Sequence, residues 1–236
     1  MSSTLAACSG VFCGGGALLN LALQRHSARN PDSWINRKVC INNNVNDQQP
    51  VRSFLVTLLG QLLIYPFFFV TAWRSGVARE GGFAGWWWGA SGAPPSAWEN
   101  GFHAWGIGYF AQDAVVHRHE LPALLQLHHV GSSVAIVCAN LTPSWRGLVL
   151  VGGFVLELGS LLVQFADLGL APRALGTAAL RWTSVFGAGV VLHGACARAP
   201  SDVPGWITAA LLFVVSAVRI SESGGGGETK RDGKAS

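Results

Sequence analysis

The sequence predicts an all-α fold, a polytopic membrane bundle of about seven transmembrane helices. Half of the 236 residues are apolar and only 12% are charged, whereas about a quarter of the residues in a soluble domain are charged. The charged residues gather in a few short segments and leave long uncharged stretches between them. This pattern excludes a soluble globule of this size, and without a long basic run nothing indicates nucleic-acid binding.

Seven apolar stretches have the length that a helix needs to cross the hydrocarbon core. We expect spans at residues 5–24, 54–73, 101–117, 122–141, 147–166, 173–195 and 203–219. Three consecutive glycines weaken the first stretch as a helix, and a cleaved signal peptide is the alternative there. No Lys or Arg precedes that stretch, which favours a retained span. Pro66 is expected to kink the second span, as membrane helices tolerate.

The segments between these spans are expected to be irregular. Residues 42–49 are rich in asparagine and should form no regular structure. The 74–100 loop carries Trp86, Trp87 and Trp88, which suit the headgroup level; a ligand platform is the alternative. Short turns are expected at residues 117–120 and 142–146. The tail from Ser221 contains four consecutive glycines and should be disordered.

The basic residues predict the orientation of the bundle. With seven spans, eleven Lys and Arg residues fall on the side that holds the 25–53 loop and the C-terminus, and four fall on the opposite side. Basic residues prefer the cytosolic side of a membrane. We therefore expect the N-terminus to face the lumen or exterior and the C-terminus to face the cytosol.

Ionisable side chains inside the expected spans are the candidate functional residues. A charge at mid-bilayer costs on the order of 3 kcal/mol, so such a residue usually has a partner or a function. Asp113, the His128–His129 pair and Glu157 fall in the cytosolic half or the centre of three consecutive spans. Consecutive antiparallel helices could bring them around one polar cavity that opens toward the cytosol. Arg181, in the sixth span, is expected to snorkel or to pair.

These side chains suit proton transfer. A neutral imidazole is a base and a nucleophile near neutral pH, and a carboxylate beside it can orient the ring and stabilise the imidazolium. Such a site could transfer an acyl group onto a lipid amine or hydroxyl. The alternative is structural, because buried polar side chains also join membrane helices through hydrogen bonds. For His103 and His193, near the luminal ends of their spans, we expect an interfacial role.

No metal or cofactor is expected. Adjacent residues of a helix point about 100° apart, so His128 and His129 are badly placed to chelate one ion together. His117 and His119 diverge in the same way. The seven histidines also form no HxxHH or HxxxH box, which leaves a membrane di-iron oxygenase without support.

Three motifs in order resemble the TLC domain. They are GYFAQD (Gly108 to Asp113), LHHVGSSVAIV (Leu127 to Val137) and FVLELGS (Phe154 to Ser160). The domain is shared by the translocating-chain-associated membrane protein, the ceramide synthases and the ceroid-lipofuscinosis type 8 protein. The resemblance covers residues 48–220, between an N-terminal span with its polar loop (1–47) and the tail (221–236).

The resemblance implies a multi-span helical fold in endomembranes, often the endoplasmic reticulum, and a role in lipid metabolism, sensing or trafficking. In ceramide synthases the paired histidines belong to the catalytic motif, which maps here to His128 and His129. That motif continues with an HDxxD-like arrangement, where this chain has LELGS with Glu157. The departure places the chain with the small TLC-domain proteins that are not synthases.

Three functions follow as hypotheses. The first is membrane lipid homeostasis through binding of a lipid or acyl chain in the polar cavity, with Tyr109 and Arg181 as further lipid contacts. The alternative is an acyltransferase that takes acyl-CoA as substrate and uses His128 or His129 as base or nucleophile, supported by Glu157 and Asp113. The third is an endomembrane trafficking receptor. In each case the expected partners are membrane lipids.

Overall fold

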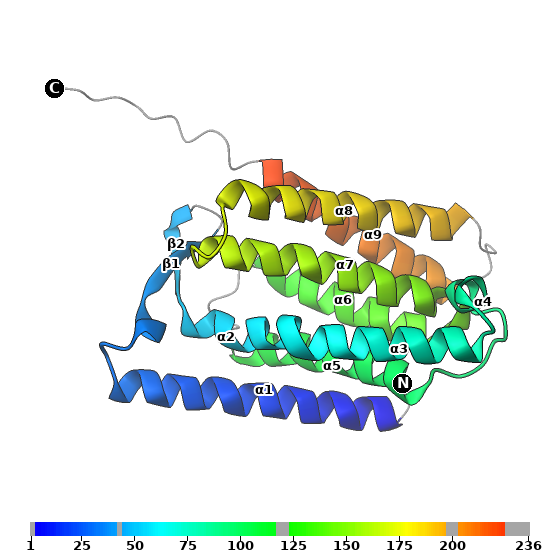
Figure 1. Cartoon of the computed structure of the whole chain (residues 1–236), viewed down its shortest axis with the longest axis horizontal. Coiled ribbons are helices and arrows are strands. Elements are labelled where there is room, and N and C mark those ends of the chain that lie inside the picture. The colour runs from blue at the N-terminus through cyan, green and yellow to red at the C-terminus, as the bar shows by residue number, and fades with distance from the viewer. Residues whose placement is uncertain (1–2, 42–43, 117–122, 197–202, 225–236) are drawn as a thin grey trace.

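The protein is a bundle of long helices that lie roughly along one axis, as a computed structural model shows (Figure 1). The structure describes residues 3–41, 44–116, 123–196 and 203–224. Within these residues the long segments are α1 (Ser3–Arg29), the stretch of α2 (Arg52–Leu59), η2 (Gly60–Ile64) and α3 (Tyr65–Arg79), then α5 (Ala97–Val116), α6 (Ala123–Leu141), α7 (Pro143–Asp167), α8 (Arg173–Cys196) and α9 (Val203–Gly224). The shorter elements are η1 (Trp34–Asn36), β1 (Lys38–Ile41), β2 (Asn44–Pro50) and α4 (Phe83–Trp88).

Five helices are long and apolar enough to cross a membrane, which fits the predicted all-α membrane bundle. Among the described residues they are α1, the α2–α3 stretch, α7, α8 and α9. The other two expected spans correspond to α5 and α6. Helix α5 packs against α1, α3 and α6, and it buries the polar side chains of Glu99, His103 and Gln112. A helix that faces other helices needs no continuous apolar surface, so hydropathy alone does not mark α5, and seven spans remain a prediction.

The N-terminal region differs from expectation in two places. Helix α1 runs through all three consecutive glycines without a break. Strands β1 and β2 pair antiparallel, with Lys38 opposite Pro50, so the prediction of irregular structure for residues 42–49 is wrong for 44–49. A partner strand satisfies the backbone groups of β2 whatever its residue preferences. Residues 42 and 43 lie outside the described chain.

The irregularity predicted at Pro66 is a π-helical segment just before it. The Tyr65 N–H bonds to the Gly60 carbonyl, five residues back, where η2 joins α2 to α3. Pro66 then occupies the first turn of α3. Since proline has no N–H and its ring crowds the carbonyl four residues earlier, a wider turn accommodates it. The π segment turns Gln61 into the bundle, where its side chain is buried.

The end of the bundle near α4 is held by one buried carboxylate, Glu99. It accepts hydrogen bonds from Arg79 Nη1 at 2.6 Å, Trp86 Nε1 at 3.1 Å and the Ser96 N–H at 2.6 Å. Trp86 fits beside Gly76, where a Cβ atom would lie 2.2 Å from the indole nitrogen. Trp86 is therefore buried between helices, and its depth in the membrane stays a prediction. Glu99 joins α3, α4 and α5.

Other expectations near helix ends also change. His103 is fully buried and accepts a hydrogen bond from Asn140 Nδ2 at 2.8 Å, so an interfacial role is wrong for it. His193 is exposed, with its ring 5.5 Å from that of Trp88.

The helix boundaries also differ from expectation. Helix α7 already begins at Pro143, which shortens the turn expected at 142–146, and α9 continues through residues 221–224, which were expected to be disordered. The turn expected at 117–120 and the rest of the tail lie outside the described residues.

Glu99 makes the stability of the bundle depend on pH. Burial alone raises the pKa of this carboxyl, which precedes the apolar stretch of α5, but the hydrogen bonds and the charge of Arg79 outweigh burial and lower the pKa below its ordinary value of 4.5. Stability from a lowered pKa is complete above the unfolded value and is lost as the pH falls through the folded value. Glu99→Gln should cost about 2 kcal/mol at pH 7, and its deficit should shrink as the pH falls below 4.5.

Thermal unfolding in detergent, followed by circular dichroism at several pH values, measures this deficit. The matched control is Asp32→Asn, which alters an exposed carboxylate and should change little at any pH. A deficit for Glu99→Gln that stays constant from pH 7 to pH 3 would contradict the proposed contribution of the ionised carboxylate.

Candidate functional site

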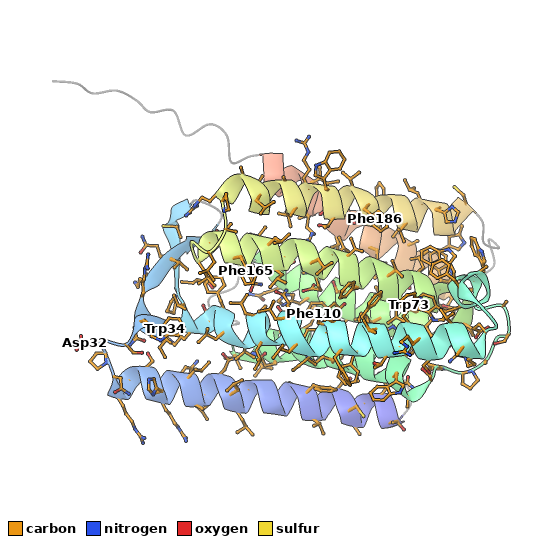
Figure 2. The ribbon with its side chains drawn as sticks, in the orientation of Figure 1. Asp32, Trp34, Trp73, Phe110, Phe165 and Phe186 are labelled. Carbon is orange, nitrogen blue, oxygen red and sulfur yellow. The ribbon has the colours of Figure 1, made fainter. Side chains whose placement is uncertain are left out.

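A polar cluster lies inside the bundle, where α5 and α6 carry an acidic residue and an imidazole that face each other. His129 Nε2 lies 3.8 Å from Asp113 Oδ2. This is longer than a hydrogen bond, and the two groups carry opposite charges only when the imidazole is protonated. The His129 side chain is buried, with its ring 5.1 Å from that of Phe110 and 5.5 Å from that of His128. Phe110, labelled in Figure 2, lies in the interior of the bundle.

Glu157 forms the second half of the cluster, from the middle of α7. Its Oε2 accepts a hydrogen bond of 2.7 Å from Gln61 Nε2, and both side chains are buried. Gln61 belongs to the π segment η2, and single π turns in helices occur frequently at functional sites. The sequence analysis did not single out Gln61, because one neutral amide in an apolar span gives little signal.

Tyr109 connects the two halves. Its hydroxyl lies within electrostatic range of both Asp113 and Glu157. The Tyr109 ring stacks on Trp105 with an interplanar angle of 4° and lies 6.3 Å from the ring of His129. The expected lipid contact at Tyr109 thus falls in the same cluster as the ionisable residues.

Arg219 supplies the positive charge of the cluster. Its guanidinium donates to Ser184 Oγ at 3.1 Å, Ser160 Oγ at 2.9 Å and the Leu156 carbonyl at 2.7 Å. It is 7% exposed and within electrostatic range of Glu157 and His128. One residue joins α7, α8 and α9 to the site.

Arg219 is one of the basic residues counted on the C-terminal side, and it lies at the end of the candidate span Val203–Ile220. Its guanidinium is nevertheless buried among α7, α8 and α9 rather than in water. Arg181, the arginine singled out from the sequence, is exposed on α8. Its expected contact with lipid remains a prediction.

The buried atoms that lack a partner indicate what the cluster can bind. Gln61 Oε1 and His129 Nδ1 are buried without a hydrogen-bond partner. Gln61 uses its amide nitrogen for Glu157, so its free atom is an acceptor. If Nε2 of a neutral His129 carries the proton that faces Asp113, then Nδ1 is an acceptor as well. Because both free atoms are acceptors, the cluster suits a ligand with a donor group such as a hydroxyl or ammonium.

Across the described residues, no group of three or more His, Cys, Asp and Glu side chains lies close enough to hold a metal ion.

The fold and the cluster define a helical membrane protein with a buried polar centre. Comparison of the chain with protein-family models, with curated proteins and with solved structures finds no match. The resemblance to the TLC domain therefore rests on the three motifs, two of which contribute Tyr109, Asp113 and His129 to one cluster and the third of which contributes Glu157.

Removing the Arg219 charge should destabilise the bundle. Arg219→Met leaves two serine hydroxyl groups and a carbonyl without their donor and leaves Glu157 without its positive neighbour, so we expect a loss of about 3 kcal/mol or more. Arg181→Met is the matched control, because it removes an exposed arginine from α8 and should change stability by less than about 0.5 kcal/mol. Equal thermal unfolding midpoints for the two variants in detergent would contradict the buried role of Arg219.

Proposed function

We propose that the protein is a multi-pass membrane protein of the TLC-domain type that acts in membrane lipid homeostasis by binding a lipid or acyl chain at the polar cluster. The observation that carries the proposal is the meeting of Asp113, His129, Tyr109 and Glu157 inside a bundle of apolar helices. Ionisable groups at membrane depth are costly and mark functional sites. This cluster is charged, partly unsatisfied and aligned with three motifs of one resemblance.

The chemistry of the cluster selects the part of the lipid that binds. The two orphaned atoms, Gln61 Oε1 and His129 Nδ1, accept hydrogen bonds, and the carboxylates do the same. A lipid with a hydroxyl or amine near its polar end satisfies these acceptors, and its acyl chain lies among the apolar side chains of the bundle. Binding through a donor group also offsets the cost of keeping these acceptors away from water.

The proposed setting is an endomembrane, such as the endoplasmic reticulum, with the C-terminus in the cytosol and α5 and α6 as the remaining two spans. The C-terminal ends of α1 and α9 and the β1–β2 hairpin share one end of the bundle, opposite α4 (Figure 1). Arg25, Arg29, Arg37 and Lys38 therefore gather at that end. Their excess supports a cytosolic location for that end, and in this orientation Asp113 and His129 would lie in the cytosolic half of the bundle.

A second candidate function is acyl transfer, which the His129–Asp113 pair favours. With Asp113 orienting the Nε2–H group, Nδ1 would take the proton from a lipid hydroxyl or amine as its oxygen or nitrogen attacks the thioester carbonyl of an acyl-CoA. The ester or amide bond forms, the carbon–sulfur bond breaks, and the imidazolium returns its proton to the thiolate of coenzyme A. Catalytic contacts often shorten when substrate binds, which accommodates the 3.8 Å separation.

The binding function predicts a lipid that depends on His129. Native mass spectrometry of the purified protein should detect a retained lipid with a hydroxyl or amine group, and His129→Ala or the double variant with His128→Ala should lower its occupancy roughly tenfold, as expected from losing one hydrogen bond to a charged or buried partner. His193→Ala, which changes an exposed histidine, is the control. Unchanged lipid in the double variant would refute binding at the cluster.

The enzymatic function predicts turnover. Purified protein given an acyl-CoA and a lipid acceptor should release free coenzyme A, and His129→Ala should reduce the rate by 10²-fold or more, as is typical for loss of a general base. The thermal unfolding midpoint serves as the check that the variant remains folded. Turnover that survives both His128→Ala and His129→Ala would exclude imidazole catalysis, whereas retained lipid without turnover would leave binding as the function.

A further inference from the structure

Helices α1 and α5 form a close seam at the edge of the bundle. A Cβ atom on Gly108 would lie 2.7 Å from the Ser9 carbonyl oxygen, and a Cβ atom on Gly16 would lie 3.0 Å from the side chain of Gln112. Residue numbers rise together on the two helices, so they run in the same direction, and Figure 1 shows α1 at the outer edge. The seam differs from the polar cluster in its unpartnered side chains, which are amides rather than ionisable groups.

Two buried amide groups in this seam have no hydrogen-bond partner. They are Asn20 Nδ2 on α1 and Gln112 Nε2 on α5, and the two residues are 3% and 2% exposed. Asn20 follows Gly16 by one helical turn, so it lies on the face of α1 that meets Gln112. Both unsatisfied atoms are donors, which is the opposite of the acceptors left free in the polar cluster.

The depth of these donors in the membrane indicates which group of a lipid lies close enough to accept their hydrogen bonds. Gln112 lies four residues before the end of α5 at Val116, and Asn20 lies five residues before Arg25, so both are roughly 6 to 8 Å from the ends of their apolar stretches. The ester carbonyls of phospholipids occupy the boundary between the headgroups and the hydrocarbon core. Water is scarce below this boundary and an unsatisfied donor there is costly.

We propose that Asn20 and Gln112 bind the acyl carbonyl oxygen of a bilayer lipid that lies against the outer edge of the α1–α5 seam. Each amide N–H₂ group donates to the carbonyl, while the acyl chain follows the apolar side of α1 that borders the seam, where Leu19 is exposed. The site recognises an ester lipid by its carbonyl and does not require a particular headgroup. This site is separate from the one proposed at the polar cluster, which selects its lipid by a hydroxyl or amine.

The test compares two lipids that differ only in the carbonyl. The full-length protein is exchanged into nanodiscs of dioleoyl phosphatidylcholine or of its diether analogue, and retained lipid is counted by native mass spectrometry after transfer to detergent. We expect the ester lipid to be retained roughly tenfold better than the ether lipid, as two hydrogen bonds to a neutral acceptor predict. Equal retention of the two lipids by the wild-type protein would overturn the proposal without the use of any variant.

Variants test whether the preference for the ester lipid arises in the seam. Gln112→Met and Asn20→Leu should abolish the preference for the ester lipid, whereas Gln24→Met, which removes an exposed amide from α1, should preserve it. Variants that keep the preference, or that raise the thermal unfolding midpoint equally in both lipids, would show that the donors bind no carbonyl. His129→Ala should leave the preference intact, so failure at the polar cluster and failure in the seam give different results.

Discussion

The structure depends on one constraint: polar groups that the bundle removes from water must find their partners within the protein or in a ligand. Glu99 meets the constraint completely, since its carboxylate accepts from Arg79, Trp86 and Ser96. Arg219 meets it with two hydroxyl groups and a carbonyl from neighbouring helices. These two residues connect the elements at the α4 end and in the α7–α9 layer, so burial of charge and cohesion of the bundle have the same cause.

Nine buried side-chain atoms of the described residues do not meet the constraint, and four of them lie in the polar cluster and the seam. Gln61 and His129 each leave a buried acceptor free, and Asn20 and Gln112 each leave a buried donor free. A purely structural polar network gains most when every member is satisfied. The unpaired atoms of the cluster and of the seam have opposite hydrogen-bonding character, which favours two different lipid groups rather than one extended binding site.

Much of the helical layout was predictable from hydropathy, because an apolar stretch of the required length has few alternatives in a membrane. The meeting of Asp113 with His129 was also predictable, since both lie near the same ends of consecutive antiparallel helices. Long-range packing was not: β2 depends on its partner strand, and Trp86 is buried only because Gly76 stands opposite it. The burial of Arg219 was not predictable either, because its partners lie on α7 and α8, far from it in the sequence.

The π segment at Gly60–Ile64 has a consequence for how the second membrane segment is built. One residue more than an α-helical turn requires is accommodated there, so everything before it is rotated by about 100° relative to everything after it. Helix α2 and helix α3 can therefore turn different sequence faces toward the same neighbour, α7, which both contact. Deletion of a single residue in this segment would restore regular α-helical winding. It would thereby rotate helix α2 about its axis relative to α3 and change how α2 meets the β1–β2 hairpin.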